Sequence, residues 1–68
     1  MIRLALSDVL TRKGITRYEL SKLTKINYAI IDNYYKNKVV RYDSDLLNRI
    51  CNALHCDIAD IIIYTPDE

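Results

Sequence analysis

The sequence predicts an all-α fold, with five short helices in a single domain that spans residues 1–68. Two observations lead to this prediction. Apolar residues recur at helical spacing through most of the chain, and signals that start and stop helices alternate along it. One glycine and one proline occur in 68 residues, so few positions oppose helix formation. A domain of this length buries about 60% of the surface that its unfolded chain exposes, and we therefore expect modest stability.

The first helix is predicted from an apolar face and a stop signal. The face comprises Leu6, Val9 and Leu10. Two basic residues in the last turn and Gly14 just after it are typical of a helix C-terminus, so this helix ends near residue 13. Apolar residues alternate ahead of the helix, which indicates that residues 1–4 are extended. Any strand would be a small addition to the helical fold.

The second helix begins at a capping signal. In the stretch TRYE, residues 16–19, the Thr16 hydroxyl can accept a hydrogen bond from the backbone of Glu19, whose carboxylate reaches back to Thr16. The inner face of this helix is predicted to comprise Leu20, Leu23 and Thr24. Two residues then remain before Asn27, which can cap the next helix. Two helices therefore meet across a very short turn.

The third helix is predicted to have an apolar back and a polar front. Its back comprises Ile30, Ile31 and Tyr34. Its outward residues are Ala29, Asp32, Asn33 and Lys36. Tyr28 and Tyr35 lie one heptad apart on the same side, where they can pack together.

Two further helices complete the predicted fold. Asp43 or Ser44 can cap the fourth, whose apolar residues are Leu47, Ile50, Cys51 and Leu54. Asp57 can cap a short fifth helix at about residues 57–64. The apolar residues assigned to this last helix are Ile58, Ile61 and Ile62.

Charge is divided unequally between two parts of the chain, although the net charge is +1. Residues 1–42 carry nine basic and three acidic side chains, a balance of +6. Residues 43–68 carry one basic and six acidic side chains, a balance of −5. This division favours a polyanionic partner on one face, whereas the alternative is ordinary solvated surface.

The cysteines indicate neither a metal centre nor a disulfide. Cys51, His55 and Cys56 supply three potential ligands, but structural zinc takes four. If both cysteines are helical, their separation along the helix axis is about 7.5 Å, too far for a disulfide. We expect buried free thiols, as suits an intracellular protein, and no metal or cofactor.

No membrane segment or enzyme site is expected. The longest apolar runs, residues 28–31 and 61–64, are far shorter than the roughly 20 residues that cross a bilayer. Asp8 interrupts the only stretch that resembles a signal peptide, so the expected location is the cytoplasm. The single histidine, His55, has no evident nucleophile or orienting acid beside it, which argues against catalysis.

The stretch RYELSKLTKINYAIIDNYYK, residues 17–36, resembles the helix-turn-helix of the Xre family, which includes the Cro proteins and repressors of lambdoid phages. Positions that this family keeps apolar are occupied by Leu20, Ile26, Ile31 and Tyr34. Ser21 takes the place of the small residue that lets the two helices approach, and Glu19 with Leu20 matches the family's EL pair. The resemblance implies a five-helix, lambda-repressor-like domain with its helix-turn-helix at about residues 16–36.

Three positions depart from the family pattern. Lys25 replaces the usual glycine of the turn, where a left-handed conformation costs it about 1 to 2 kcal/mol. Ile30 stands where serine or threonine is common. Asn37 replaces the glycine that often ends the third helix, and asparagine tolerates that conformation.

The resemblance also implies which residues contact DNA. The base-facing candidates are Asn27, Tyr28, Ala29 and Asn33. The phosphate-contacting candidates are Arg17, Lys36, Lys38 and Arg41. Asn33 is the best reader because a side-chain amide can pair with adenine in a bidentate way. Asn27 is expected to be occupied as a helix cap, and Tyr28 either reaches DNA or packs on Tyr35.

A homodimer is expected because the C-terminal segment is too apolar for one short helix to bury. Residues 61–64 are consecutively apolar, and neighbouring helical residues point about 100° apart. The predicted interface comprises Ile61, Ile63 and Tyr64. In the alternative, this segment folds back on Ile2 and Leu4.

These features favour a transcriptional regulator that binds a palindromic double-stranded operator as a homodimer and acts by occlusion. A small-molecule effector is not expected, because the chain has no room for a sensing domain. The alternative is a protein-interaction module on the same frame, such as an antitoxin or a phage-encoded inhibitor. The small set of base-reading side chains motivates that alternative.

Overall fold

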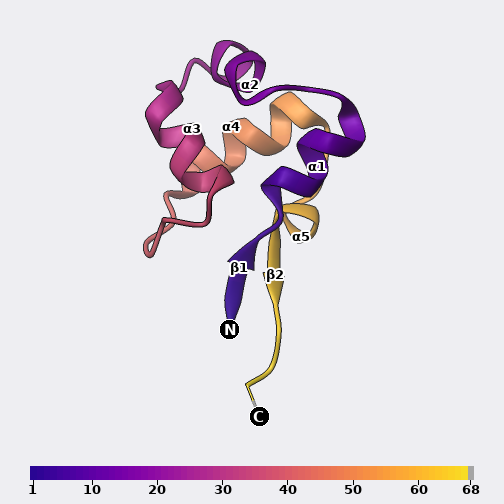
Figure 1. Ribbon diagram of the computed structural model, residues 1–68, viewed down its shortest axis with the longest axis vertical. Helices are drawn as coiled ribbons and strands as arrows, with labels where there is room; N and C mark the ends of the chain where they lie inside the picture. Colours follow the sequence, from indigo (N-terminus) through magenta and orange to yellow (C-terminus); the bar gives the residue numbers. More distant parts are fainter. Residues whose placement is uncertain (68) are drawn as a thin grey trace.

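Five helices and two short strands make up residues 1–67, the part of the chain that this computed structural model describes (Figure 1). In chain order they are β1 (Ile2–Leu4), α1 (Leu6–Lys13), α2 (Arg17–Thr24), α3 (Tyr28–Tyr35), α4 (Ser44–Leu54), α5 (Ile58–Ile61) and β2 (Ile62–Tyr64). The expected helical fold is therefore correct in its main part, and the strands are a small addition at one end.

The predicted helix starts are present. Thr16 and Glu19 form the capping box, with backbone-to-side-chain distances of 3.1 Å in both directions. The Asn27 side chain accepts from the backbone N–H of Ala29 at 2.8 Å. Asp43, rather than Ser44, caps α4. Each cap satisfies backbone donors that the first helical turn leaves unpaired.

Each of the first four helices is followed by a residue with left-handed backbone. These residues are Gly14 (φ 66°), Lys25 (φ 58°), Asn37 (φ 60°) and His55 (φ 52°). At three of these ends a backbone N–H donates to the carbonyl of the residue five positions earlier, as in a Schellman motif. The bonds run from Ile15 N to Leu10 O, from Lys38 N to Asn33 O, and from Cys56 N to Cys51 O.

Replacing Lys25 with glycine is expected to stabilise the domain by about 1 kcal/mol, because a side chain is unfavourable in left-handed backbone. Thermal unfolding measures the change. Lys22→Gly is the matched control, since it removes the same charge from the interior of α2 and should lower stability by about 1 kcal/mol. A lower melting temperature for Lys25→Gly would contradict the expectation.

One hydrophobic core joins the helices. Its buried residues are Leu4, Leu6, Val9, Leu10, Leu20, Ile26, Ile31, Tyr34, Leu47, Ile50, Leu54 and Ile61. Tyr34 also accepts a hydrogen bond from the backbone N–H of Asp43 at 3.1 Å through its hydroxyl. This bond ties α3 to the start of α4.

Two predicted core positions are wrong. Leu23 is 61% exposed, because α2 packs on α3 and α4 through a stripe centred on Leu20 and Thr24. Ile30 is 39% exposed, because α3 turns Ile31 inward and the preceding residue points about 100° away from it. An eight-residue helix at the edge of a small domain buries a narrower stripe than its composition suggests.

The predicted C-terminal helix at residues 57–64 is also wrong in its second half. The helix ends at Ile61, and the next three residues form β2. This strand pairs antiparallel with β1, so that Ile2 faces Tyr64 and Leu4 faces Ile62. Consecutive β-branched side chains favour extended backbone, and the alternating strand at the N-terminus supplies the partner.

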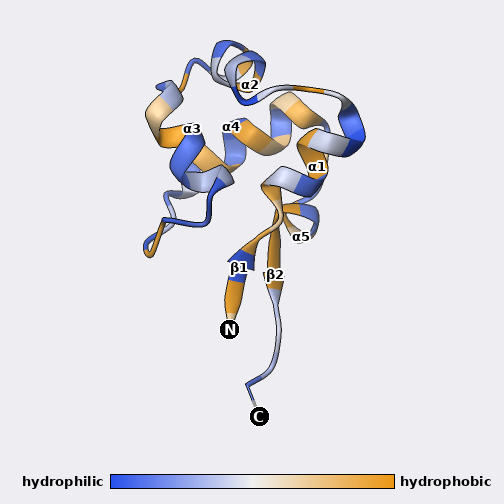
Figure 2. Ribbon diagram, viewed as in Figure 1, coloured by the Kyte–Doolittle hydropathy of each residue, from blue (hydrophilic) through white to orange (hydrophobic). Residues whose placement is uncertain are grey.

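The two strands form a ribbon that extends away from the helices toward one end of the long axis (Figure 1). Both strands are largely hydrophobic (Figure 2). Met1 and Thr65 continue the pairing beyond the strands. The N-terminal ammonium of Met1 donates to the Thr65 carbonyl at 2.6 Å, and the Thr65 N–H donates to the Met1 carbonyl at 2.8 Å, measured from nitrogen to oxygen. The C-terminal segment thus folds back on Ile2 and Leu4, as in the alternative prediction, and this pairing within one chain does not test the homodimer.

Asn37 links the end of α3 to this ribbon. Its side-chain oxygen accepts from the Leu4 backbone N–H at 2.7 Å, and its amide nitrogen donates to the Leu4 carbonyl at 2.9 Å. The amide thus pairs with the outer edge of β1 as a neighbouring strand would. Asn37 therefore has two roles, as left-handed cap and as strand partner.

Candidate nucleic-acid interface

The turn between α2 and α3 is held by side chains as well as by the core. The Ser21 hydroxyl donates to the carbonyl of Ile26 at 2.6 Å. The Thr24 hydroxyl donates to the Leu20 carbonyl at 2.7 Å and accepts from the N–H of Ile26 at 3.3 Å. The Ile26 side chain is buried. These contacts set the angle at which α3 leaves α2.

The outward side of α3 is small and accessible. Ala29 and Asn33 are exposed, as expected for residues that face a groove. The side-chain oxygen of Asn27 is occupied by its capping bond. Ile30 belongs to the exposed residues of this helix, so the outward side is more apolar than predicted.

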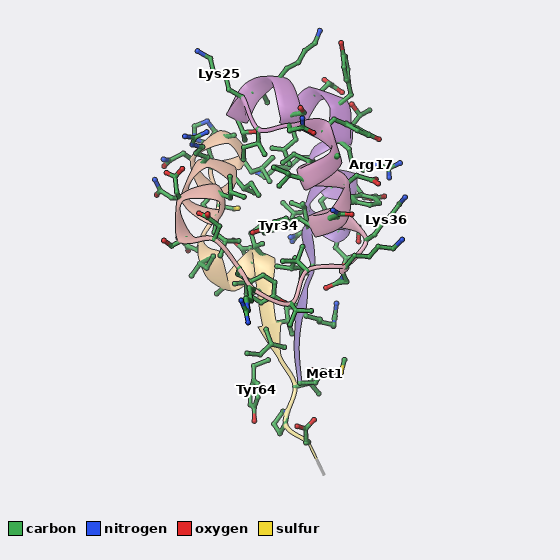
Figure 3. All side chains as sticks on the ribbon, turned by 90° about the vertical axis from the view of Figure 1, so that its left-hand side faces the viewer. Met1, Arg17, Lys25, Tyr34, Lys36 and Tyr64 are labelled. Carbon is green, nitrogen blue, oxygen red and sulfur yellow. The ribbon has the colours of Figure 1, made fainter. Side chains whose placement is uncertain are left out.

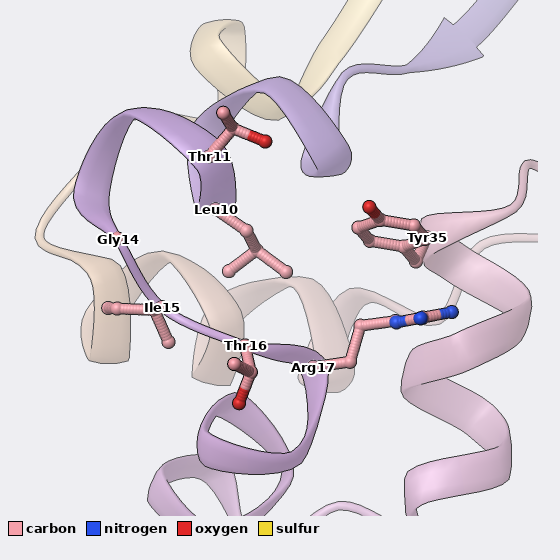
Figure 4. Close-up of a pocket in the computed structure, with 7 residues that line it drawn as sticks. All are labelled: Leu10, Thr11, Gly14, Ile15, Thr16, Arg17 and Tyr35. Atoms are coloured by element: carbon pink, nitrogen blue, oxygen red, sulfur yellow. The ribbon is translucent and has the colours of Figure 1, made fainter.

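Tyr28 is 43% exposed and therefore accessible from outside the domain. Its alternative partner, Tyr35, has another neighbour, because the Arg17 guanidinium carbon lies 4.4 Å from the centre of the Tyr35 ring. Figure 4 shows Arg17 reaching from the start of α2 toward this ring, where both residues line a pocket of about 300 Å³. A cation over an aromatic face is attracted to its electron density.

Arg17 and Lys36 lie on the same side of the domain (Figure 3). Both contact Asp32: the Arg17 Nη1 lies 2.6 Å from one carboxylate oxygen, and the Lys36 Nζ lies 3.0 Å from the other. The other two phosphate candidates, Lys38 and Arg41, are exposed in the loop that follows α3. Between them lies Val40, an apolar residue that is 92% exposed and that the sequence did not single out.

The hydrogen bond from Lys36 lowers the pKa of Asp32 below its ordinary value of 3.8. Partial burial opposes this effect, and the hydrogen bond from Arg17 reinforces it. The carboxylate is therefore ionised throughout the neutral range.

Acid unfolding is expected to depend on Asp32. Because its pKa is lower in the folded than in the unfolded chain, it stabilises the fold above the unfolded pKa, and this contribution disappears as pH falls through the lowered pKa. The stability difference between the wild type and Asp32→Asn should therefore shrink below about pH 4. Urea unfolding at neutral and acidic pH measures it. A difference that stays constant over this range would contradict the prediction.

The predicted dimer residues divide into buried and accessible ones. Ile61 is wrong as an interface residue, because it is 0% exposed and belongs to the core, as α5 turns it toward α1. Ile63 is half-buried, and Tyr64 is 67% exposed. Tyr64 and Met1 lie at the far end of the ribbon in Figure 3.

The two cysteines are not both helical, so the helical separation of about 7.5 Å expected between them is wrong. The helix ends at Leu54, and Cys56 turns back so that its N–H donates to the Cys51 carbonyl. Burial raises the pKa of the Cys56 thiol, and Cys51 raises it further. Both cysteines are free. Within residues 1–67, no group of three or more His, Cys, Asp or Glu residues could hold a metal ion.

A family model for the Cro/C1-type helix-turn-helix DNA-binding domain matches residues 5–67. The chain belongs to this family. The match covers all five helices, and it confirms the resemblance to Xre-like helix-turn-helix proteins. A search of curated proteins finds no match. Both α2 and α3, with the short turn between them, lie within the matched residues. None of the described helices is long and apolar enough to cross a membrane.

Proposed function

We propose that this Cro/C1-type protein is a cytoplasmic, sequence-specific regulator of transcription that acts as a repressor by occluding a palindromic operator. The observation that carries the proposal is the outward side of α3, where Ala29 and Asn33 are exposed on the same helix as Asp32, which pairs with Arg17 and Lys36. A helix of this kind enters the major groove of B-DNA with its N-terminal part at the base edges.

Asn33 is the main base reader in this proposal. It is exposed, and its amide can donate to and accept from adenine at the same time. Ala29 contributes an apolar contact, most simply with a thymine methyl, and the exposed Ile30 extends that apolar strip. Tyr28 donates its hydroxyl to a base edge or phosphate, while Asn27 remains a cap. Few bases per half-site are read.

Phosphate contacts supply most of the affinity. Arg17 and Lys36 flank α3 on one side, and Lys38 and Arg41 follow it in the next loop. Such contacts set the position of the helix in the groove and make binding dependent on salt.

A homodimer supplies the selectivity that one small reading surface lacks. Two copies related by a twofold axis place their recognition helices about 34 Å apart, one turn of DNA. The exposed apolar residues of the ribbon, Met1, Ile2 and Tyr64, support association there. The half-buried Ile63 pairs with Arg3 and lies on the other face of the ribbon. Sedimentation of the protein with and without Tyr64→Asp tests this part of the proposal.

Selection from a library of random duplexes tests the function directly. The purified protein is expected to enrich a short palindromic sequence at moderate salt, and a regulator of this kind then protects that sequence from nuclease digestion. Failure to enrich any duplex would overturn the proposal.

A second candidate function is a protein-interaction module, such as an antitoxin or an inhibitor. The observation that favours it is the exposed apolar ribbon combined with the small base-reading surface. Two variants distinguish the candidates. Biological activity that survives Asn33→Ala combined with Lys38→Ala, but is lost in Ile63→Asp, would favour protein binding over DNA binding.

A further inference from the structure

One carboxylate holds two of the cations that are proposed to contact DNA. Asp32 lies on α3, Arg17 on the first turn of α2, and Lys36 just after α3, and both ion pairs are within hydrogen-bond distance. Tyr35 supports the arrangement, since its ring lies beneath the Arg17 guanidinium. We call these four residues the Asp32 clamp.

An acid at this position opposes simple attraction to DNA. Asp32 is adjacent in sequence to Asn33, and its side chain is only 21% exposed. A carboxylate near a phosphate backbone repels it, and it also reduces the combined charge of the three ionised groups to +1. A surface that only needed affinity for DNA would be expected to have a neutral residue here.

We propose that Asp32 is a positioning residue that aligns Arg17 and Lys36 for their phosphates and weakens binding to DNA on which the helix is out of position. This inference rests on the proposed DNA-binding function. It gives the acid on α3 a role in selectivity, beyond its role in joining the two helices.

The positioning follows from how the donors are shared. The Arg17 guanidinium has five N–H donors and the Lys36 ammonium has three, and the ion pairs with Asp32 engage one nitrogen of each. The remaining donors stay available to phosphate oxygens. Because the clamp already restricts both long side chains, less conformational entropy is lost when they bind.

The charge of Asp32 acts on misplaced DNA. When α3 sits correctly, the two cations stand between the carboxylate and the phosphates. On a duplex where the helix is shifted, at least one of the two cations no longer lies between the phosphates and the Asp32 carboxylate. The carboxylate then repels the phosphates, and this repulsion adds to the loss of the cation–phosphate contact. Selectivity therefore increases while affinity for arbitrary sequence decreases.

Asp32→Asn tests the inference because it keeps the shape of the side chain and removes its charge. The matched control is Asp45→Asn, which removes the same charge from α4 and also breaks an ion pair four residues apart, with Arg49 at 3.2 Å. Both variants are titrated with the duplex selected by the wild-type protein and with a scrambled duplex of equal length, at several salt concentrations.

Asp32→Asn is expected to bind the scrambled duplex about threefold more tightly, because a repulsive charge is removed. On the scrambled duplex, the slope of log K against log salt should steepen by about 0.9 for each cation that gains a phosphate contact when the carboxylate charge is removed. Its preference for the selected over the scrambled duplex should fall by about tenfold. Asp45→Asn should change the affinities for both duplexes by the same factor and leave the preference unchanged.

Arg17→Lys provides a test that does not depend on the fold of Asp32→Asn. It keeps the charge and loses the planar group that contacts both Asp32 and Tyr35. The preference should fall while the salt slope stays the same.

Three outcomes would overturn the inference. If Asp32→Asn behaves like Asp45→Asn, or changes only the unfolding midpoint, the ion pairs are purely structural. If Arg17→Lys keeps the full preference, the clamp does not position Arg17. In the first two outcomes the wild type still selects a duplex, so the DNA-binding proposal stands. If the wild type selects none, both proposals fail.

Discussion

Replacing Asn37 with alanine is expected to lower the free energy of unfolding by about 3 to 4 kcal/mol. Alanine in the left-handed backbone of this position, φ 60°, costs about 1 to 2 kcal/mol. The substitution also removes both hydrogen bonds to the Leu4 backbone, each of which contributes about 1 kcal/mol. Urea unfolding followed by circular dichroism measures the total.

Asn37→Gly separates these two contributions. Glycine accepts the left-handed backbone freely, so this variant loses the two hydrogen bonds alone and should be destabilised by about half as much. Asn33→Ala controls for loss of an exposed asparagine and should change stability by less than about 0.5 kcal/mol. If Asn37→Gly is as stable as the wild type, the pairing with β1 contributes nothing.

The same Asn33→Ala variant is expected to have the largest effect on DNA recognition. Losing a bidentate pair with adenine should weaken binding to the selected duplex by about 10- to 100-fold. Binding to a scrambled duplex should change little, because phosphate contacts dominate there. Fluorescence anisotropy with both duplexes measures the two affinities.

Asn48→Ala is the matched control for recognition. Asn48 is an exposed asparagine on α4, so its loss should leave both affinities unchanged. An equal loss on both duplexes in Asn33→Ala would show that this residue contributes to general attraction only. If Asn33→Ala binds both duplexes as tightly as the wild type does, Asn33 does not contact the bases.

The parts of the fold that could be predicted are those determined by neighbours in sequence. The capping box at Thr16, the caps at Asn27 and Asp43 and the left-handed end at Gly14 each involve residues a few positions apart. Their local preferences agree with the final structure, so the helices and the short turn between α2 and α3 were predictable.

The parts that could not be predicted depend on distant partners. Residues 62–64 have an apolar pattern that fits a helix as well as a strand, and the choice is made by β1 at the other end of the chain. The exposure of Leu23 and Ile30 follows from which helices pack against α2 and α3. The periodicity of apolar residues does not say which neighbours those are.

The candidate site shows the same division. Residue types and the family pattern indicated the exposed positions of α3 and the cations around it. The pair between Asp32 and Lys36 could have been recognised from its spacing of four residues. The contact of Asp32 with Arg17 could not, because it depends on the angle between α2 and α3.

The ribbon of β1 and β2 also has a consequence for how the chain folds as it leaves the ribosome. The helix-turn-helix consists of neighbours in sequence, and such contacts form early. The pairing of Met1 with Thr65 joins residues 64 positions apart, so it must wait until residue 65 has been synthesised. We therefore expect α2 and α3 to fold first, and closure of the ribbon to be the last and slowest step.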